Sequence, residues 1–258
     1  MGSYEDLAAR DVSSAWLRRT ERAGAGRRPS ESDEGLFSDG HGGVEPLLER
    51  PSQPVCRLCR SALSFFFQVA FPPRLPWSDW TLAVFACTDC GSERHLVPES
   101  PRGRLKAANI SQSFYSRYQS NFRFLAFPST DAVPRRDYVP RVAFKSWRML
   151  PMAGPAPRKA TLFSGRQGRV VVGGRPRWLT EDEAPATYAR NEPMTFLMHV
   201  PEGYRFGRLS GAPPQVFPRF GFPERIERDY SLFVRNALFF FGTADPSLGA
   251  VFVVPQRT

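Results

Sequence analysis

Residues 56–90, CRLCRSALSFFFQVAFPPRLPWSDWTLAVFACTDC, decide the expected fold of this chain. The stretch begins and ends with a Cys-x-x-Cys pair, and the two pairs use all four cysteines of the 258 residues. Two such turns can supply the four thiolates of a tetrahedral metal site. Between them, the Phe- and Val-rich runs at 63–71 and 80–87 predict two strands joined by a proline-rich turn. We therefore expect a β-hairpin whose ends are clamped by a metal ion.

The spacing favours structural Zn²⁺ as that ion, because closed four-cysteine sites are the common structural zinc sites. With every ligand position taken by protein sulfur, no position remains for water, and a catalytic zinc is not expected. Two disulfides, a thioredoxin-like redox pair and chance spacing are the alternatives. They fit less well, since no secretory signal is seen and neither pair opens a helix after a βαβ pattern. The expected ligands are Cys56, Cys59, Cys87 and Cys90.

The two Cys-x-x-Cys turns differ in the residue that follows each pair. Gly91, after the second pair, suits a tight turn that points backbone N–H groups at sulfur. The first pair has Arg60 in the matching place, so that turn fits the pattern less well.

The rest of the chain also favours strands and turns over long helices, with 25 Pro, 20 Gly and 22 Phe. A helix or a poorly regular segment is expected within 105–125, where aromatic residues recur at helical spacing, and a short helix within 11–19. The proline- and glycine-rich residues 207–223 predict an irregular loop. Further strands are expected at 141–150, 168–172, 194–200, 237–243 and 249–254.

A shift of 131 residues aligns the two halves of the chain. Phe65 then falls on Phe196 and Val69 on Val200, and the match resumes further on, where Phe85 faces Phe240. The cysteines have no counterparts. The fold class expected is mainly β with a minor α part: internally duplicated β units that form one body, with a zinc-clamped hairpin in the first half. Chance alignment of two β-rich segments is the alternative.

This pattern divides the chain into three parts. Residues 1–38 are expected to be a mobile polar tail, 39–130 the zinc-bearing first repeat and 131–258 the cysteine-free second repeat. On this division, Cys87→Ser should destabilise the protein sharply and leave an isolated 131–258 fragment unaffected.

The net charge of +10, with a pI near 10.0, allows a nucleic-acid partner through an Arg-rich surface. The arginines are scattered, however, and only three residues are lysine. This preference for arginine fits the base composition of the genome as well as it fits selection for phosphate contacts. No apolar run reaches the length of a membrane span, so no membrane partner is expected. The expected location is cytoplasmic.

Several segments resemble the superfamily that joins programmed cell death protein 2 with the bacterial YwqG-like proteins. They are the GGRPRWL turn at 173–179, the Cys pair followed by a strand ending in Gln68-Val69, the strand LAVFA into the second Cys pair, and NALFFFGT at 236–243. The resemblance implies a binding role, and eukaryotic relatives look like chaperones of a small-subunit ribosomal protein. A basic client of that kind does not suit a chain of charge +10.

No catalytic motif appears around the three histidines, and His199, which aligns with Gln68, is interpreted as a polar strand residue rather than a general base. Trp178 is interpreted as a plug of the β core, with stacking on a partner as the alternative. We therefore expect a non-enzymatic, zinc-containing protein-binding factor, chaperone-like or an adaptor. The alternatives are a nucleic-acid-binding zinc protein and an immunity or antitoxin-like protein that caps a toxin domain.

Overall fold

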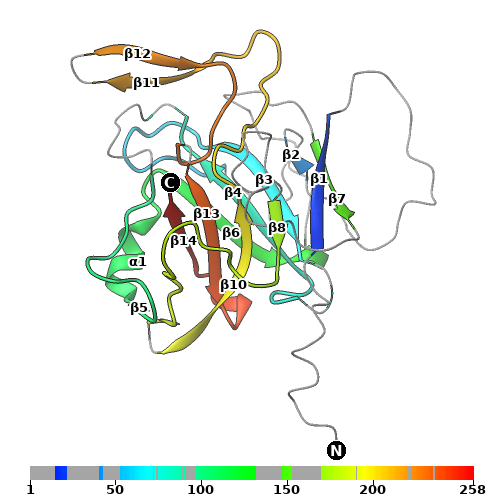
Figure 1. The fold of residues 1–258 in the computed structure, drawn as a ribbon, viewed down its shortest axis with the longest axis vertical. Coiled ribbons are helices and arrows are strands. Elements are labelled where there is room, and N and C mark those ends of the chain that lie inside the picture. The colour runs from blue at the N-terminus through cyan, green and yellow to red at the C-terminus, as the bar shows by residue number, and fades with distance from the viewer. Residues whose placement is uncertain are drawn as a thin grey trace, which may run out of the picture.

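The computed structural model describes residues 15–21, 41–42, 53–71, 73, 75–88, 90, 97–131, 147–152, 170–189, 191–219, 222–234 and 236–258. These residues form a mainly β protein, as expected (Figure 1). The strands are β1 (Ala15–Glu21), β2 (His41–Gly42), β3 (Ser64–Ala70), β4 (Trp80–Ala86), β5 (Asn109–Ile110), β6 (Phe122–Pro128), β7 (Trp147–Met152), β8 (Val170–Val172), β9 (Thr187–Tyr188), β10 (Glu192–Val200), β11 (Gln215–Arg219), β12 (Phe222–Glu227), β13 (Ala237–Thr243) and β14 (Val251–Gln256). The helical segments are α1 (Gln112–Tyr118) and two 3₁₀ turns, η3 (Ser129–Asp131) and η4 (Pro246–Leu248).

The described strands form three sheets. The largest has the order β14-β13-β10-β8-β1-β7-β2, and short β9 and β5 extend it from β10. A three-stranded sheet has the order β3-β4-β6, and β11 and β12 form a separate two-stranded sheet. The hairpin β11–β12 projects from the body of the molecule (Figure 1).

Two antiparallel three-stranded units, β3-β4-β6 and β10-β13-β14, share the same strand order. Their registers also agree. An irregularity interrupts the ladder between Phe65 and Phe67 in β3, and between Phe196 and Met198 in β10. The 131-residue shift aligns these two places, so the first strand of each unit is irregular at the equivalent position.

The middle strands correspond with an offset of one residue from the sequence alignment. Phe65 pairs with Phe85, whereas Phe196 pairs with Phe241 and not with its neighbour Phe240. The alignment of Phe85 with Phe240 was therefore wrong by one position, because strand pairing, which sequence comparison does not see, sets the register. Common ancestry of the two units stays a prediction.

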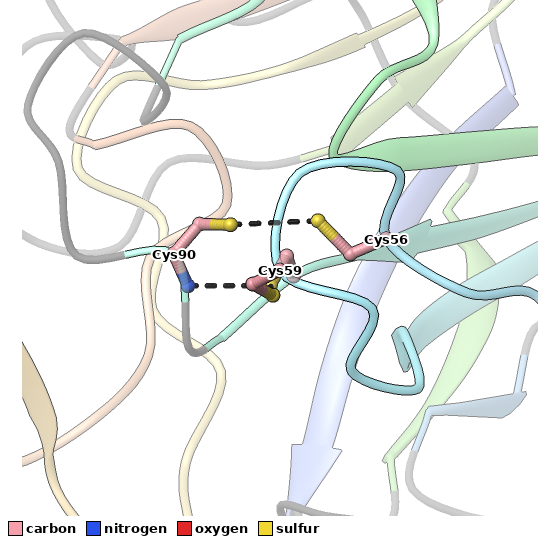
Figure 2. A group of neighbouring side chains, drawn as sticks. Cys56, Cys59 and Cys90 are labelled. Carbon is pink, nitrogen blue, oxygen red and sulfur yellow. Dashed lines mark hydrogen bonds between the residues drawn. The ribbon is translucent and has the colours of Figure 1, made fainter.

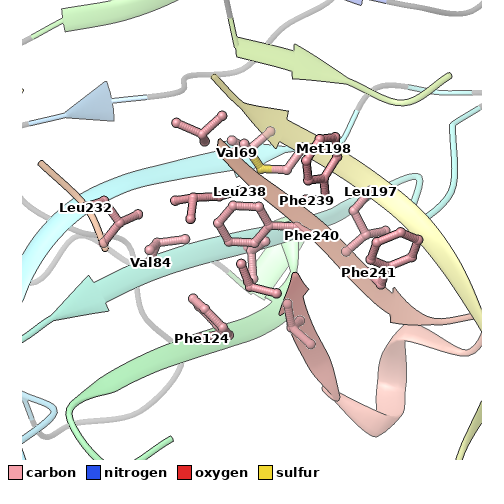
Figure 3. Packing of buried hydrophobic residues seen from close by; sticks show 14 of the residues in the cluster. Val69, Val84, Phe124, Leu197, Met198, Leu232, Leu238, Phe239, Phe240 and Phe241 are labelled. Atoms are coloured by element: carbon pink, nitrogen blue, oxygen red, sulfur yellow. The ribbon is translucent and has the colours of Figure 1, made fainter. Parts of the chain in front are cut away.

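One hydrophobic core joins the two units. Ring centroids of Phe67 and Phe240 lie 6.3 Å apart, and those of Phe124 and Phe240 lie 5.6 Å apart. The indole Nε1 of Trp77 donates to the carbonyl oxygen of Thr243 at 2.7 Å. Figure 3 shows Val84 and Phe124 of one sheet facing Leu238 and Phe240 of the other. The single body that we expected is present, and the two halves bury each other's apolar faces.

Most expected strands are confirmed, with three differences. The prediction of a short helix within 11–19 is wrong for the part that the structure describes. Residues 15–21 form β1, which pairs with β7 and β8. The helix expected within 105–125 is α1, but it ends at Tyr118, and β6 follows from Phe122. The loop expected at 207–223 is wrong for β11 and the start of β12. In the first two cases pairing with a strand distant in the sequence decided the outcome, and in the third β11 and β12 pair with each other. Local propensity does not report either kind of pairing.

The rest of the expected polar tail, residues 1–14 and 22–38, lies outside the described residues. Among the helices that the structure describes, none is long and apolar enough to cross a membrane.

Candidate metal centre

The four cysteines come from two loops at one end of the β3–β4 hairpin. Cys56 and Cys59 lie in the loop before β3, which an isolated bridge between Val55 and Ala62 closes. Cys87 and Cys90 follow the end of β4 directly. Because Ser64 pairs with Ala86, antiparallel pairing brings the two loops together. The expected position of the four cysteines, at the ends of the hairpin, is confirmed.

The four sulfur atoms gather into one cluster. All of them lie within 4.8 Å of one another, with Cys56 Sγ 3.4 Å from Cys90 Sγ and Cys59 Sγ 3.5 Å from Cys87 Sγ. Figure 2 shows Cys56 and Cys90 facing each other from the two loops. A tetrahedral ion with bonds of about 2.3 Å to sulfur separates its ligands by about 3.8 Å. The cluster therefore fits a metal ion, and the cysteines are free thiols rather than disulfides.

Backbone hydrogen bonds shape both loops around sulfur. The amide of Cys90 donates to Cys87 Sγ at 3.2 Å, which is the turn expected of the second pair. In the first loop the amide of Arg60 donates to the carbonyl of Cys56 at 3.0 Å. Arg60 reaches this turn with φ of 65°, the left-handed conformation that glycine adopts without strain. Gly91 lies outside the described residues.

The thiols differ in their acidity. Burial raises the pKa of Cys59, but hydrogen bonds from the side chain and backbone of Ser61 outweigh burial and bring that pKa down to about 7. Burial raises the pKa of Cys90 far above its usual range, and hydrogen bonds with Cys56, Cys59 and Cys87 raise it further. Without a cation, each ionised sulfur opposes ionisation of the next, whereas a bound divalent ion stabilises all four thiolates.

The cluster sits at the edge of a second, smaller core. Cys56 is fully buried and packs with Leu63, Phe65 and Phe85 on the face of the β3-β4-β6 sheet that points away from the main core. Cys59 is exposed, and Cys87 and Cys90 are half-buried. One side of the site is thus supported by apolar side chains, while the other side is open to solvent.

Three contacts of the two loops were not expected from sequence. The amide of Arg57 donates to the carbonyl of Ser120 at 2.7 Å, and its guanidinium Nη1 donates to the carbonyl of Ser116 at 3.0 Å. The amide of Cys87 donates to the carbonyl of Asn121 at 2.8 Å. Each partner lies about 30 or more residues away in the chain and accepts through its backbone, so no local residue pattern could have indicated it.

The other residues considered from sequence lie away from this cluster. Trp178 is half-buried and packs on Phe239 and Phe241, with ring centroids 4.5 and 5.9 Å away, which agrees with its interpretation as a plug of the β core. His199 is a buried residue of β10 that stacks on Phe239 at 4.5 Å. Its Nε2 is the one buried side-chain nitrogen or oxygen without a hydrogen-bond partner among the described residues.

No family model, curated protein or solved structure matches the chain. The resemblance to the programmed cell death protein 2 and YwqG-like superfamily therefore stays a prediction, and what is shown of the site is a cluster of four cysteines that could hold a metal ion.

Proposed function

We propose that this protein is a non-enzymatic, zinc-containing protein-binding factor, chaperone-like or an adaptor. The metal would be structural Zn²⁺ bound by Cys56, Cys59, Cys87 and Cys90, because four thiolates satisfy zinc and leave no position for water. A reducing cytoplasm, where thiols stay available for the metal, belongs to the same proposal.

The observation that carries the binding role is an exposed apolar pair on the projecting hairpin β11–β12. Val216 and Ile226 are directly paired across the two strands, so their side chains share one face. They are 37 % and 66 % exposed, respectively. Large apolar side chains brought together on a protruding element are typical of interaction sites rather than of ordinary surface.

The base of this hairpin is held firmly to the body. The side chain of Gln215 donates to the carbonyl of Ser231 at 3.1 Å and accepts from the amide of Ser231 at 2.8 Å. Arg205 and Glu227 form an ion pair at 3.2 Å, with side chains only 22 % and 15 % exposed. A rigid base presents the apolar face in one orientation, which lowers the entropy cost of binding.

The net charge of the chain favours one kind of partner, while the charges beside the hairpin, Glu227, Arg228 and Asp229, are of both signs. Arg228 is exposed and lies two residues after Ile226, and the chain as a whole carries +10. A partner with an apolar contact bordered by acidic side chains would be favoured, because opposite charges steer the encounter. The implied ribosomal client of the family, being basic, is again disfavoured.

The test is affinity purification of the tagged full-length protein from native lysate, with and without nuclease treatment, and with zinc measured on the same sample. The double variant Val216→Ser/Ile226→Ser should lose a stoichiometric protein partner that survives nuclease. Leu248→Ser is the matched control, since Leu248 is a 52 % exposed apolar residue elsewhere, and it should keep the partner.

Two outcomes contradict the proposal. Equal recovery with the hairpin variant and the control would remove the hairpin as the binding element. Recovery of nucleic acid, lost with nuclease and with rising salt, would make the arginine-rich surface the working part instead.

A further inference from the structure

The outer edge of β14 is closed by two tyrosine hydroxyls. β14 is the outermost strand of its sheet, so alternate backbone groups point away from β13. The amide of Val251 donates to the hydroxyl of Tyr115 at 2.8 Å, and the amide of Val253 donates to that of Tyr118 at 2.9 Å. The Tyr118 hydroxyl in turn lies 3.2 Å from the carbonyl of Val253, to which it donates. The next outward position is Pro255, which has no N–H.

Both tyrosines belong to α1, which lies beside β14 (Figure 1). A helix of 7 residues is too short to be stable by itself, so its position depends on what holds it. The rings of Phe114 and Tyr118 pack on Phe252 of β14, with centroids 6.2 and 5.0 Å apart. This packing places the hydroxyl groups at the strand edge.

The last part of α1 and the turn after it are tied to both cysteine loops. Arg57, between Cys56 and Cys59, donates through its side chain and its amide to the carbonyls of Ser116 and Ser120. Cys87, in the other loop, donates through its amide to the carbonyl of Asn121. The segment 116–121 is therefore hydrogen-bonded to the two loops that a metal ion in the cluster would hold together.

We infer that the metal ion holds α1 on the edge of β14, and that its loss uncovers this edge while the strand stays paired with β13. The inference rests on the proposed metal site. Without the ion the two loops separate and the three hydrogen bonds to 116–121 lose their fixed partners. α1 then rests on its packing against Phe252 and withdraws its hydroxyls from β14 more often. An open strand edge is a surface on which another strand can pair, so the metal state decides whether that surface exists.

Amide hydrogen exchange, followed by NMR on the full-length reduced protein, tests this inference. Zinc-loaded protein is compared with protein stripped by a chelator, and zinc is measured in both. Exchange at Val251 and Val253 should quicken roughly 100-fold on zinc removal, the product of three hydrogen bonds that each contribute a factor of about 5. Phe252 and Val254, whose amides alternate toward β13, serve as the control within the same strand and should quicken only by the factor that the loss of global stability sets.

A second comparison keeps the zinc in place. Arg57→Ala removes the side-chain bond to Ser116 and should quicken exchange at Val251 and Val253 about 5-fold in the zinc-loaded protein. Arg117→Ala, which removes an exposed arginine of α1 itself, is the matched control and should leave both rates unchanged.

The outcomes separate this inference from the proposed function. Zinc uptake followed by unchanged exchange at Val251 and Val253 on removal overturns the inference alone. Equal acceleration at all four β14 amides also overturns it, because the ion would then hold the whole fold and not the edge. A reduced chain that takes up no zinc refutes the proposed metal site and the inference together.

Discussion

The contact between Gly242 and Trp77 gives a sharp test of how the two halves are packed. A methyl group added at Gly242 would lie 2.4 Å from Cζ2 and 2.7 Å from Cε2 of Trp77, and 2.8 Å from Cδ1 of Leu197. Ordinary carbon contacts are about 3.5–4.0 Å. The indole ring must therefore move by about 1 Å, and it is only 4 % exposed, so there is little free space for it.

The expected cost of Gly242→Ala has two parts. Overpacking of a filled core costs about 1–3 kcal/mol. Displacing the ring also weakens its hydrogen bond to the carbonyl of Thr243, which is 2.7 Å long and buried, at a cost of about 0.5–1.5 kcal/mol. The sum, about 2–4 kcal/mol, corresponds to a fall in Tm of roughly 5–15 °C for a chain of this size.

Urea unfolding of the zinc-loaded protein measures this cost, and a double-mutant cycle identifies its cause. Trp77→Leu removes the ring that the methyl group would strike, so Gly242→Ala should cost less than 1 kcal/mol, roughly, in that background. If Gly242→Ala is as stable as the wild type, or costs the same with and without Trp77, the close packing of the two halves described above is refuted.

Three further predictions concern the metal, the buried histidine and the first cysteine turn. Cys87→Ser should lower zinc content below one per chain and lower Tm to that of chelator-treated wild type; a variant as stable as the wild type would refute a structural metal. Burial lowers the pKa of His199 from 6.5 to about 4, so the folded state stays neutral while the unfolded state binds a proton as the pH falls from 6.5 to 4. The free energy of unfolding should therefore drop by about 3 kcal/mol over that window. Urea titrations at each pH compare His199→Leu with the wild type, and the variant should lack this part of the drop. Any contribution of zinc to the pH dependence is common to both proteins. Arg60→Gly should stabilise the zinc-loaded protein by about 0.5–1 kcal/mol in the same assay, because glycine adopts φ of 65° without strain; a loss of stability would show that the turn is not strained.

The shared core also changes an expectation drawn from the sequence. An isolated 131–258 fragment would lose Phe67 and Phe124 from the ring cluster around Phe240, together with the bond from Trp77. We now expect this fragment not to fold by itself, since it would expose one face of its sheet. Circular dichroism of the purified fragment checks this, and a cooperative unfolding transition would contradict it.

The ligand set and the hairpin that carries it could be predicted because their signals are local. Each Cys-x-x-Cys pair lies within four residues, and LSFFFQVAF and WTLAVFA are strand-forming by composition alone. Antiparallel pairing of the two strands then brings the two cysteine pairs together, and any hairpin that joins these strands would place the cysteine pairs near each other.

The strands missed in the sequence have weak local signals. β6 (FRFLAFP) contains Arg123 and follows an aromatic-rich helix, and β11 and β12 contain Pro218 and Pro223. They are strands because neighbours offer backbone partners: β4 pairs with β6 along its length, and β11 and β12 pair with each other. Proline is tolerated in the hairpin since both of its strands are edge strands.

The sequence by itself determined the four thiols, their division into two loops and the mainly β character of the chain, because residue type and short-range spacing decide these. Only the tertiary structure decided that α1 closes the edge of β14, that both cysteine loops hold α1 in place, and that one core serves both halves. Those contacts join backbone groups and ring faces more than 25 residues apart. Backbone hydrogen bonds are chemically the same at every residue, so nothing in the amino-acid code marks which distant pair will form.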